Sequence, residues 1–197
     1  YADEMRKLNK EFPEEQDIVT LFVDAMMNRN PWNLWDLKTG APSEGADTLE
    51  AREVLERAMA KFHCDSHRHP GLLHLYIHLM EMSPTPEAAL PQADDFRHLL
   101  PDAEHLQHMS THIDVLRENY LDVVTWKEQG IKADELYWKN ASGMNSSSLY
   151  HVHNYQFKLY SAMFLGQFLP AMEAARGLKD TVPEEFFPQK SPLIADW

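Results

Sequence analysis

The sequence has only one cysteine, Cys64, among its 197 residues, so it cannot form a disulfide within the chain. A single cysteine is compatible with a reducing compartment, which slightly favours the cytoplasm. No apolar stretch approaches the roughly 18 residues of a membrane-spanning helix. There is also no long run of alternating β-branched residues of the kind that forms a sheet. These absences predict a soluble, all-α protein with no membrane partner.

Basic residues are scarce as well. The chain has 18 Lys and Arg against 31 Asp and Glu, which gives a formal net charge of −13. Nucleic acids and anionic membranes are bound through basic patches, so this balance excludes both as partners. The chain begins at Tyr1 and ends at Trp197. We expect residues 1–197 to form a single helical-repeat domain that is a fragment or a processed form of a longer chain.

Histidine is the residue that the sequence has in excess, with 11 copies. His74 and His78 are four residues apart, and so are His108 and His112. Residues with this spacing share one face of a helix, so each pair forms a stripe of imidazoles flanked by Leu, Ile and Met. The second pair follows the first by 34 residues, which is the period of one tetratricopeptide repeat.

Apolar periodicity and the positions of Pro and Gly predict helices joined by short breaks. The loop over residues 30–47 contains Pro and Gly, and we expect it to be ordered, with the rings of Trp32 and Trp35 mostly buried against the first helices. The predicted helices cover residues 2–11, 14–27, 48–62, 70–82, 86–100, 103–118, 120–138, 150–165 and 170–178.

The motifs resemble those of a subgroup of tetratricopeptide-repeat (TPR) proteins. The shared patterns are His-Pro-Gly-x-x-His-x-x-x-His-x-x-Glu at residues 69–81, His-Leu-x-His-Met-x-x-His-Ile at 105–113 and Tyr-x-x-His-Asn at 150–154. The chain departs from the subgroup at Gln156, where many members have His. The resemblance implies a TPR-like α-α superhelix whose histidines face its concave groove. It implies no particular activity.

Imidazole is the commonest protein ligand for transition metals at neutral pH. Histidine pairs at matching positions of successive repeats predict one cluster, in which His74, His78, His108 and His112 bind an ion of Zn, Fe, Mn or Cu. Glu81 and His153 are the expected additions, as ligands or as groups that fix an imidazole tautomer. The Glu of a His-Glu-x-x-His protease helix is absent between the paired histidines.

Two classes of function follow from this pattern. One is a metal centre in the groove, which either stores the ion or binds a small molecule and supports hydrolytic or oxidative chemistry. The other is a scaffold that binds a peptide or protein in the concave groove, with neither metal nor catalysis. The sequence identifies no catalytic residue, so it leaves open whether the protein is an enzyme.

Overall fold

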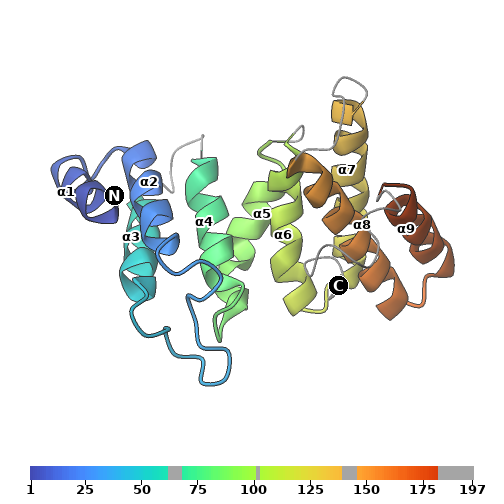
Figure 1. Cartoon of the computed structure of the whole chain (residues 1–197), viewed down its shortest axis with the longest axis horizontal. Helices are drawn as coiled ribbons and strands as arrows, with labels where there is room; N and C mark the ends of the chain where they lie inside the picture. The colour runs from blue at the N-terminus through green and yellow to red at the C-terminus, as the bar shows by residue number, and fades with distance from the viewer. Residues whose placement is uncertain (62–67, 101–102, 139–145, 182–197) are drawn as a thin grey trace. The chain divides into compact units, whose positions relative to one another are not determined.

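The structure is a computed structural model that describes residues 1–61, 68–100, 103–138 and 146–181 (Figure 1). These residues form helices and connecting loops, and their only β-type pairing is an isolated bridge between Trp35 and Pro42. The prediction of an all-α fold is therefore confirmed. Cys64 and Pro101 lie outside the described residues. Within the described ranges, no helix is both long enough and apolar enough to cross a membrane.

Each predicted helix is present, with ends that differ by a few residues. The largest differences are that α8 begins four residues earlier than expected and that residues 86–100 form a short 3₁₀ helix followed by a short α-helix. The elements are α1 (Ala2–Glu11), α2 (Gln16–Met27), α3 (Thr48–Lys61), α4 (Pro70–Met80), η1 (Pro86–Ala89), α5 (Leu90–Arg97), α6 (Glu104–Leu116), α7 (Tyr120–Trp138), α8 (Ser146–Phe164) and α9 (Phe168–Thr181).

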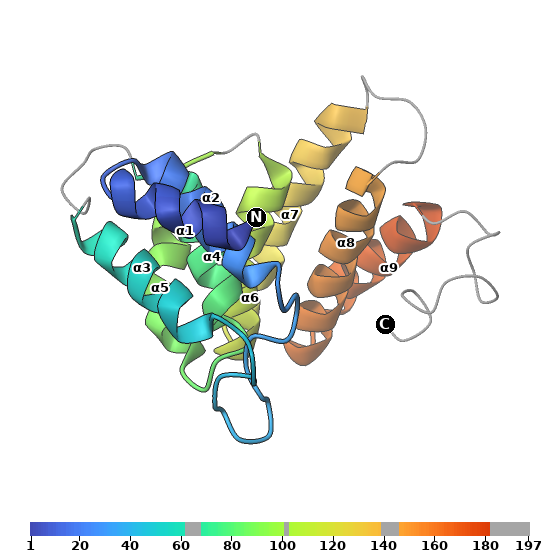
Figure 2. The ribbon, with the colours of Figure 1, turned by 60° about the vertical axis from the view of Figure 1, so that its left-hand side comes forward.

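The chain divides into two compact units, a first unit of residues 1–99 and a second unit of residues 100–197. In the first unit, α2 packs against α1, α3 and α4, and α4 also packs against α3 and α5. In the second unit, α6 packs against α7 and α8, α7 packs against α8, and α8 packs against α9 (Figures 1 and 2). The expectation of a single domain over residues 1–197 stays a prediction.

Helix α4 contributes more buried residues to the core of the first unit than any other helix of that unit. Pro70 occupies its first turn, where the missing backbone N–H has no helical partner to lose. The helix is apolar on nearly every side, as expected of a helix that is enclosed by its neighbours. Full burial of an apolar side chain contributes about 1.5–3 kcal/mol. The buried residues of α4 are Leu72, Leu73, Leu75, Tyr76, Ile77, Leu79 and Met80.

The loop between α2 and α3 docks onto the end of α4 through Trp35. The Trp35 ring is 5% exposed, and its Nε1–H donates to the carbonyl oxygen of Leu79 over 2.7 Å. This bond satisfies one of the carbonyls that the last turn of a helix leaves without a partner. Thr48 at the start of α3 closes the loop by donating its hydroxyl to the Leu34 carbonyl over 2.6 Å.

The expectation for the two tryptophans is thus correct for Trp35 and wrong for Trp32. Trp32 is 85% exposed. It occupies a turn with φ of 54°, a left-handed conformation that is uncommon for a residue other than Gly. The Trp32 and Trp35 rings therefore point in different directions, and of the two only Trp35 enters the core.

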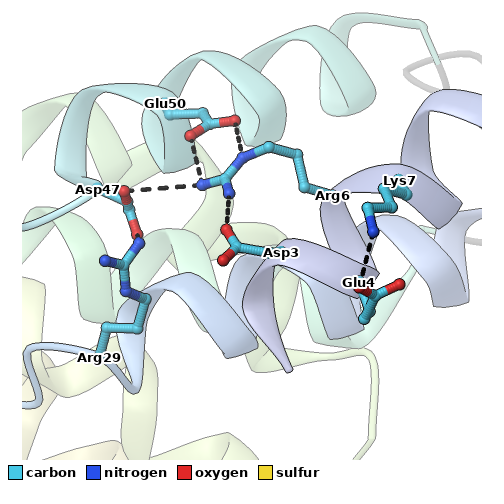
Figure 3. Close-up of polar contacts among 7 residues, drawn as sticks. All are labelled: Asp3, Glu4, Arg6, Lys7, Arg29, Asp47 and Glu50. Carbon is cyan, nitrogen blue, oxygen red and sulfur yellow. Dashed lines mark hydrogen bonds and ion pairs between the residues drawn. The ribbon is translucent and has the colours of Figure 1, made fainter.

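Ion pairs join α1 to the start of α3 (Figure 3). The Arg6 guanidinium binds both carboxylate oxygens of Glu50 over 2.9 Å each, and it contacts Asp3 and Asp47 as well. Arg29 reaches the other oxygen of Asp47 over 2.7 Å. The hydrogen bonds with Glu50 raise the pKa of Arg6, which stays charged. Arg6 therefore anchors α1 to Glu50 of α3, and Arg6 and Arg29 together hold the end of the loop at Asp47.

We predict that Trp35→Phe lowers the free energy of unfolding by about 1–3 kcal/mol, because it leaves the buried Leu79 carbonyl without its donor. Trp32→Phe makes the same chemical change on an exposed ring and should cost less than about 0.5 kcal/mol. Urea unfolding followed by far-UV circular dichroism measures both. Equal effects of the two substitutions would contradict the capping role of Trp35.

Candidate metal centre

Three histidines of the second unit form one cluster, called the His triad below: His108 and His112 on α6 and His153 on α8. Each offers a ring nitrogen, and these atoms all lie within 4.8 Å of one another. The ring centroid of His108 is 4.6 Å from that of His112 and 4.6 Å from that of His153. The four-residue spacing on α6 and the packing of α8 against α6 produce this arrangement.

The two histidines of α6 already point at a common position. Their Nε2 atoms are 2.6 Å apart, a hydrogen-bond distance in which one ring donates to the other. Two ligands of a tetrahedral ion bound at about 2.0–2.1 Å are roughly 3.3 Å apart. The rings therefore need to separate by roughly 0.7 Å to hold an ion between them, a change within the range of side-chain rotation.

A buried polar network orients the His108 ring through its Nδ1 atom. Its Nδ1 lies 3.0 Å from Oδ1 of Asn154, and the Asn154 amide donates to Asp134 over 3.2 Å. Asp134 also lies 2.6 Å from Nδ1 of His151. All four side chains are buried. A hydrogen bond from the far nitrogen of a histidine fixes its tautomer and ring orientation, which is the usual support of a metal ligand.

Lys127 of α7 belongs to the same network and is fully buried. Its Nζ donates to Asn154 Oδ1 over 3.1 Å, contacts Nδ1 of His108, and lies 4.6 Å from the ring centroid of Phe157. A charged lysine donates hydrogen bonds and cannot accept them, so Nδ1 of His108 must be the acceptor. This favours the His108 tautomer that carries its proton on Nε2. A metal on Nε2 requires the opposite tautomer. Lys127 and an ion therefore compete for the state of His108.

The environment of His108 also opposes its protonation. Burial lowers the pKa of His108 well below 6.5, and the charges of Lys127, His112 and His153 lower it further. The ring is consequently neutral at physiological pH. Neutral imidazole is the form that binds metals.

Other rings and an amide group also contact the triad. The His105 ring stacks on that of His108, with centroids 6.0 Å apart. The Phe157 ring packs against all three histidines, with centroid distances of 5.6, 5.2 and 4.5 Å to His108, His112 and His153. Oε1 of Gln156 is 3.4 Å from Nδ1 of His153. The residue that departs from the TPR subgroup pattern thus faces a triad histidine and can orient it.

The structure places the other predicted site residues in the first unit. The rings of His74 and His78 on α4 have centroids 4.7 Å apart, and Nδ1 of His78 lies 2.8 Å from a carboxylate oxygen of Glu81. Glu81 can therefore orient the His78 ring, and its part in a metal site stays a prediction. The His74 ring also stacks on Phe96, with centroids 6.3 Å apart. A single ion shared by the histidine pairs of both units stays a prediction.

The sequence pattern did not identify Lys127, Asp134 and His151 as members of the site. One signal was present, because Lys127 follows Val123 by four residues and so lies on the same face of α7. Both are fully buried in the structure. A lysine on a buried helix face requires a buried partner, which here is Asn154 with His108.

Comparison of the chain with protein-family models, with curated proteins and with solved structures gives no match. The interpretation of the site therefore depends on its own geometry and chemistry.

The lowered pKa of His108 predicts a specific loss of stability in acid. The unfolded chain takes up a proton near pH 6.5 that the folded chain excludes. The contribution of His108 to stability is thus fully present above pH 6.5 and is lost as the pH falls from there through the folded value, at up to about 1.4 kcal/mol per pH unit.

The substitution His108→Gln should flatten this part of the profile, whereas His98→Gln, at an exposed histidine, should leave it unchanged. Urea unfolding between pH 8 and 5, with a chelator present, measures the slope. Identical slopes for wild type and His108→Gln would show that His108 is not the group responsible.

Proposed function

We propose that the second unit binds a transition-metal ion through the His triad. The observation that carries the proposal is the convergence of three imidazole nitrogens, from His108, His112 and His153, within 4.8 Å of one another. The supporting observations are the neutral state of His108 and the hydrogen-bond acceptors beside Nδ1 of His108 and of His153. These are the features that a metal ligand set requires besides its donor atoms.

The donor set narrows the choice of metal. The triad contains imidazoles and no carboxylate, and imidazole suits Zn, Cu and Fe, whereas Mn prefers carboxylate and water ligands. Of the four metals expected from the sequence, Zn, Cu and Fe therefore fit this cluster better than Mn. Three histidines with a fourth position for water or substrate are also the ligand set of one class of catalytic zinc sites.

Three protein ligands leave a position on the ion for a small molecule. A metal bound to neutral ligands keeps its full charge, so it polarises a bound carbonyl or lowers the pKa of a bound water. This chemistry would make the protein a metal-dependent hydrolytic or oxidative enzyme. The His triad would be its ligand set, and the substrate would bind at the open position.

We also propose that the helices form a TPR-like superhelix. Support comes from the 34-residue recurrence and from the packing, in which α2 contacts both α3 and α4, and α6 contacts both α7 and α8. In such a repeat, the first helix of each pair packs against its partner and against the next first helix. The alternative function, a peptide or protein scaffold without metal, stays a prediction that metal analysis distinguishes from the first.

We predict that the purified protein binds one equivalent of Zn²⁺ through the triad, in competition with a colorimetric chelator. His112→Ala and His153→Ala should each weaken the affinity by more than about 100-fold, because loss of an outer-shell group alone costs 10–100-fold. His98→Ala, at an exposed histidine of the first unit, should have no effect.

Both triad substitutions are at half-buried positions and should preserve the fold, which far-UV circular dichroism can verify. Repetition of the titration with Cu²⁺ and Fe²⁺ determines the metal preference. The proposal fails if the wild type binds none of these ions stoichiometrically, or if the triad variants bind as tightly as His98→Ala. Either result would favour the scaffold function.

A second prediction concerns Lys127. Lys127→Met removes a positive charge that contacts a ligand ring and frees His108 to bind the ion in the required tautomer. The affinity for Zn²⁺ should rise at least tenfold, since repulsion between the ammonium and a divalent ion in a buried site exceeds the ~1.4 kcal/mol that tenfold represents.

This gain is informative because misfolding can only weaken metal binding. Lys132→Met, at an exposed lysine of the same helix, is the matched control and should leave the affinity unchanged. Affinity that falls in Lys127→Met while the helical content is preserved would show that Lys127 supports the site and does not compete with the ion.

A further inference from the structure

Exposed apolar side chains gather at one end of the second unit, where the α6–α7 and α8–α9 connections lie (Figure 1). This group is called the apolar end below, and each of its members is between 38% and 72% exposed. Single exposed apolar residues are normal on a protein surface, whereas a contiguous group indicates an interaction site. The apolar end consists of Leu116, Leu121, Tyr160, Met163, Phe164, Leu165, Phe168 and Leu169.

Ring contacts and a tight turn make this group contiguous. The Tyr120 ring at the start of α7 stacks on that of Phe164 near the end of α8, with centroids 5.0 Å apart, and the Tyr160 ring lies 4.6 Å from that of Phe164. Gly166, with φ of 67°, then reverses the chain so that α9 begins at Phe168. The apolar residues on the two sides of this turn are therefore adjacent.

The area of the apolar end matches what a stable interface requires. At roughly 100 Å² for each half-exposed side chain, these residues present on the order of 800 Å². That area exceeds the roughly 300–600 Å² of the largest apolar patch on a typical monomer. It equals the ~800 Å² that each partner contributes to an interface of standard size.

The distribution of charge identifies a second copy of the chain as the occupant. Most of the apolar end lies within residues 159–172, which contain no Asp, Glu, Lys or Arg. Two chains that each carry a net charge of −13 repel one another, so they approach most easily where charge is lacking.

The turn between α6 and α7 adds charges of both signs at the edge of this face. Arg117 is followed directly by Glu118, and Asp122 lies in the first turn of α7, all three exposed. A two-fold interface brings the same surface together from both copies, so Arg117 of one copy can pair with an acidic residue of the other. A strongly acidic or strongly basic partner would instead meet a like charge at this turn.

We infer that the apolar end of the second unit binds the apolar end of a second copy, which makes the protein a two-fold symmetric dimer. The α8–α9 corner of each copy packs against that of the other, and the rings of Tyr160 and Phe164 are removed from water. Aromatic residues are enriched in the buried core of such interfaces. The inference does not depend on the proposed metal function, because no residue of the His triad belongs to the apolar end.

Sedimentation velocity over a dilution series of the full chain tests the inference, with a chelator present so that no metal ion can bridge two copies. We expect an equilibrium between monomer and dimer with a dissociation constant of about a micromolar or tighter, the range of interfaces of this size. A chain that stays monomeric at every accessible concentration, or that forms open-ended oligomers, would overturn the inference.

Leu169→Asp and Phe168→Asp should each weaken dimerisation by at least roughly 100-fold, because each buries an unpaired carboxylate in an apolar contact. Both positions lie in the first turn of α9, where an acidic side chain suits the helix dipole, so the fold should persist. Leu49→Asp, at an exposed leucine in the first turn of α3, is the matched control and should leave the dissociation constant unchanged.

Far-UV circular dichroism verifies the helical content of all three variants. If well-folded Leu169→Asp and Phe168→Asp dimerise as tightly as Leu49→Asp does, the apolar end is not the interface and the inference is wrong.

Discussion

Two opposite charges are buried among the helices of the second unit, and the packing of these helices depends on neutralising both. Lys127 on α7 and Asp134, about two turns further along the same helix, are both shielded from water. An isolated buried charge is very costly, so each requires polar partners. Asn154 on α8 meets both requirements, because its carbonyl oxygen accepts from Lys127 and its amide donates to Asp134. This single amide sets the register of α8 against α7, and through its contact with His108 it also sets the position of α6.

The same arrangement explains why the triad histidines lie so close together. Once Asn154 and Lys127 hold His108 by its Nδ1 edge, its Nε2 edge can face only the space that it shares with His112 and His153. Phe157 closes one side of that space with an aromatic ring. Neutral imidazoles can satisfy one another pairwise, as His108 and His112 do. The proposed ion would accept a lone pair from each of the three rings, whose nitrogens lie within 4.8 Å of one another.

The positions of the helices and part of the His triad could be predicted from the sequence. Helical periodicity located every helix, because each has an apolar face that must be buried, and four-residue spacing placed His108 and His112 on one face of α6. The contribution of His153 required the resemblance to TPR proteins, since spacing alone cannot relate α8 to α6. The orienting network remained hidden because the partners of Lys127, Asp134 and His151 come from different helices, and pairing across helices depends on packing. The sequence also could not predict which of Trp32 and Trp35 is buried. That depends on the left-handed backbone conformation of Trp32.

The histidines of the two units have different hydrogen-bond partners, and these partners affect how strongly each imidazole donates electrons to a metal. In the first unit, Glu81 lies 2.8 Å from His78, and a carboxylate behind an imidazole makes it a stronger electron donor. In the second unit, amide oxygens of Asn154 and Gln156 take that place, and the charge of Lys127 lies beside His108. Ligands supported in this way donate less charge to an ion, so the ion stays more electrophilic. A site that only stores metal gains from strong donors, whereas a site that polarises a bound water or carbonyl gains from weak ones. In the metal site proposed here, the environment of the triad would favour Lewis-acid chemistry over storage.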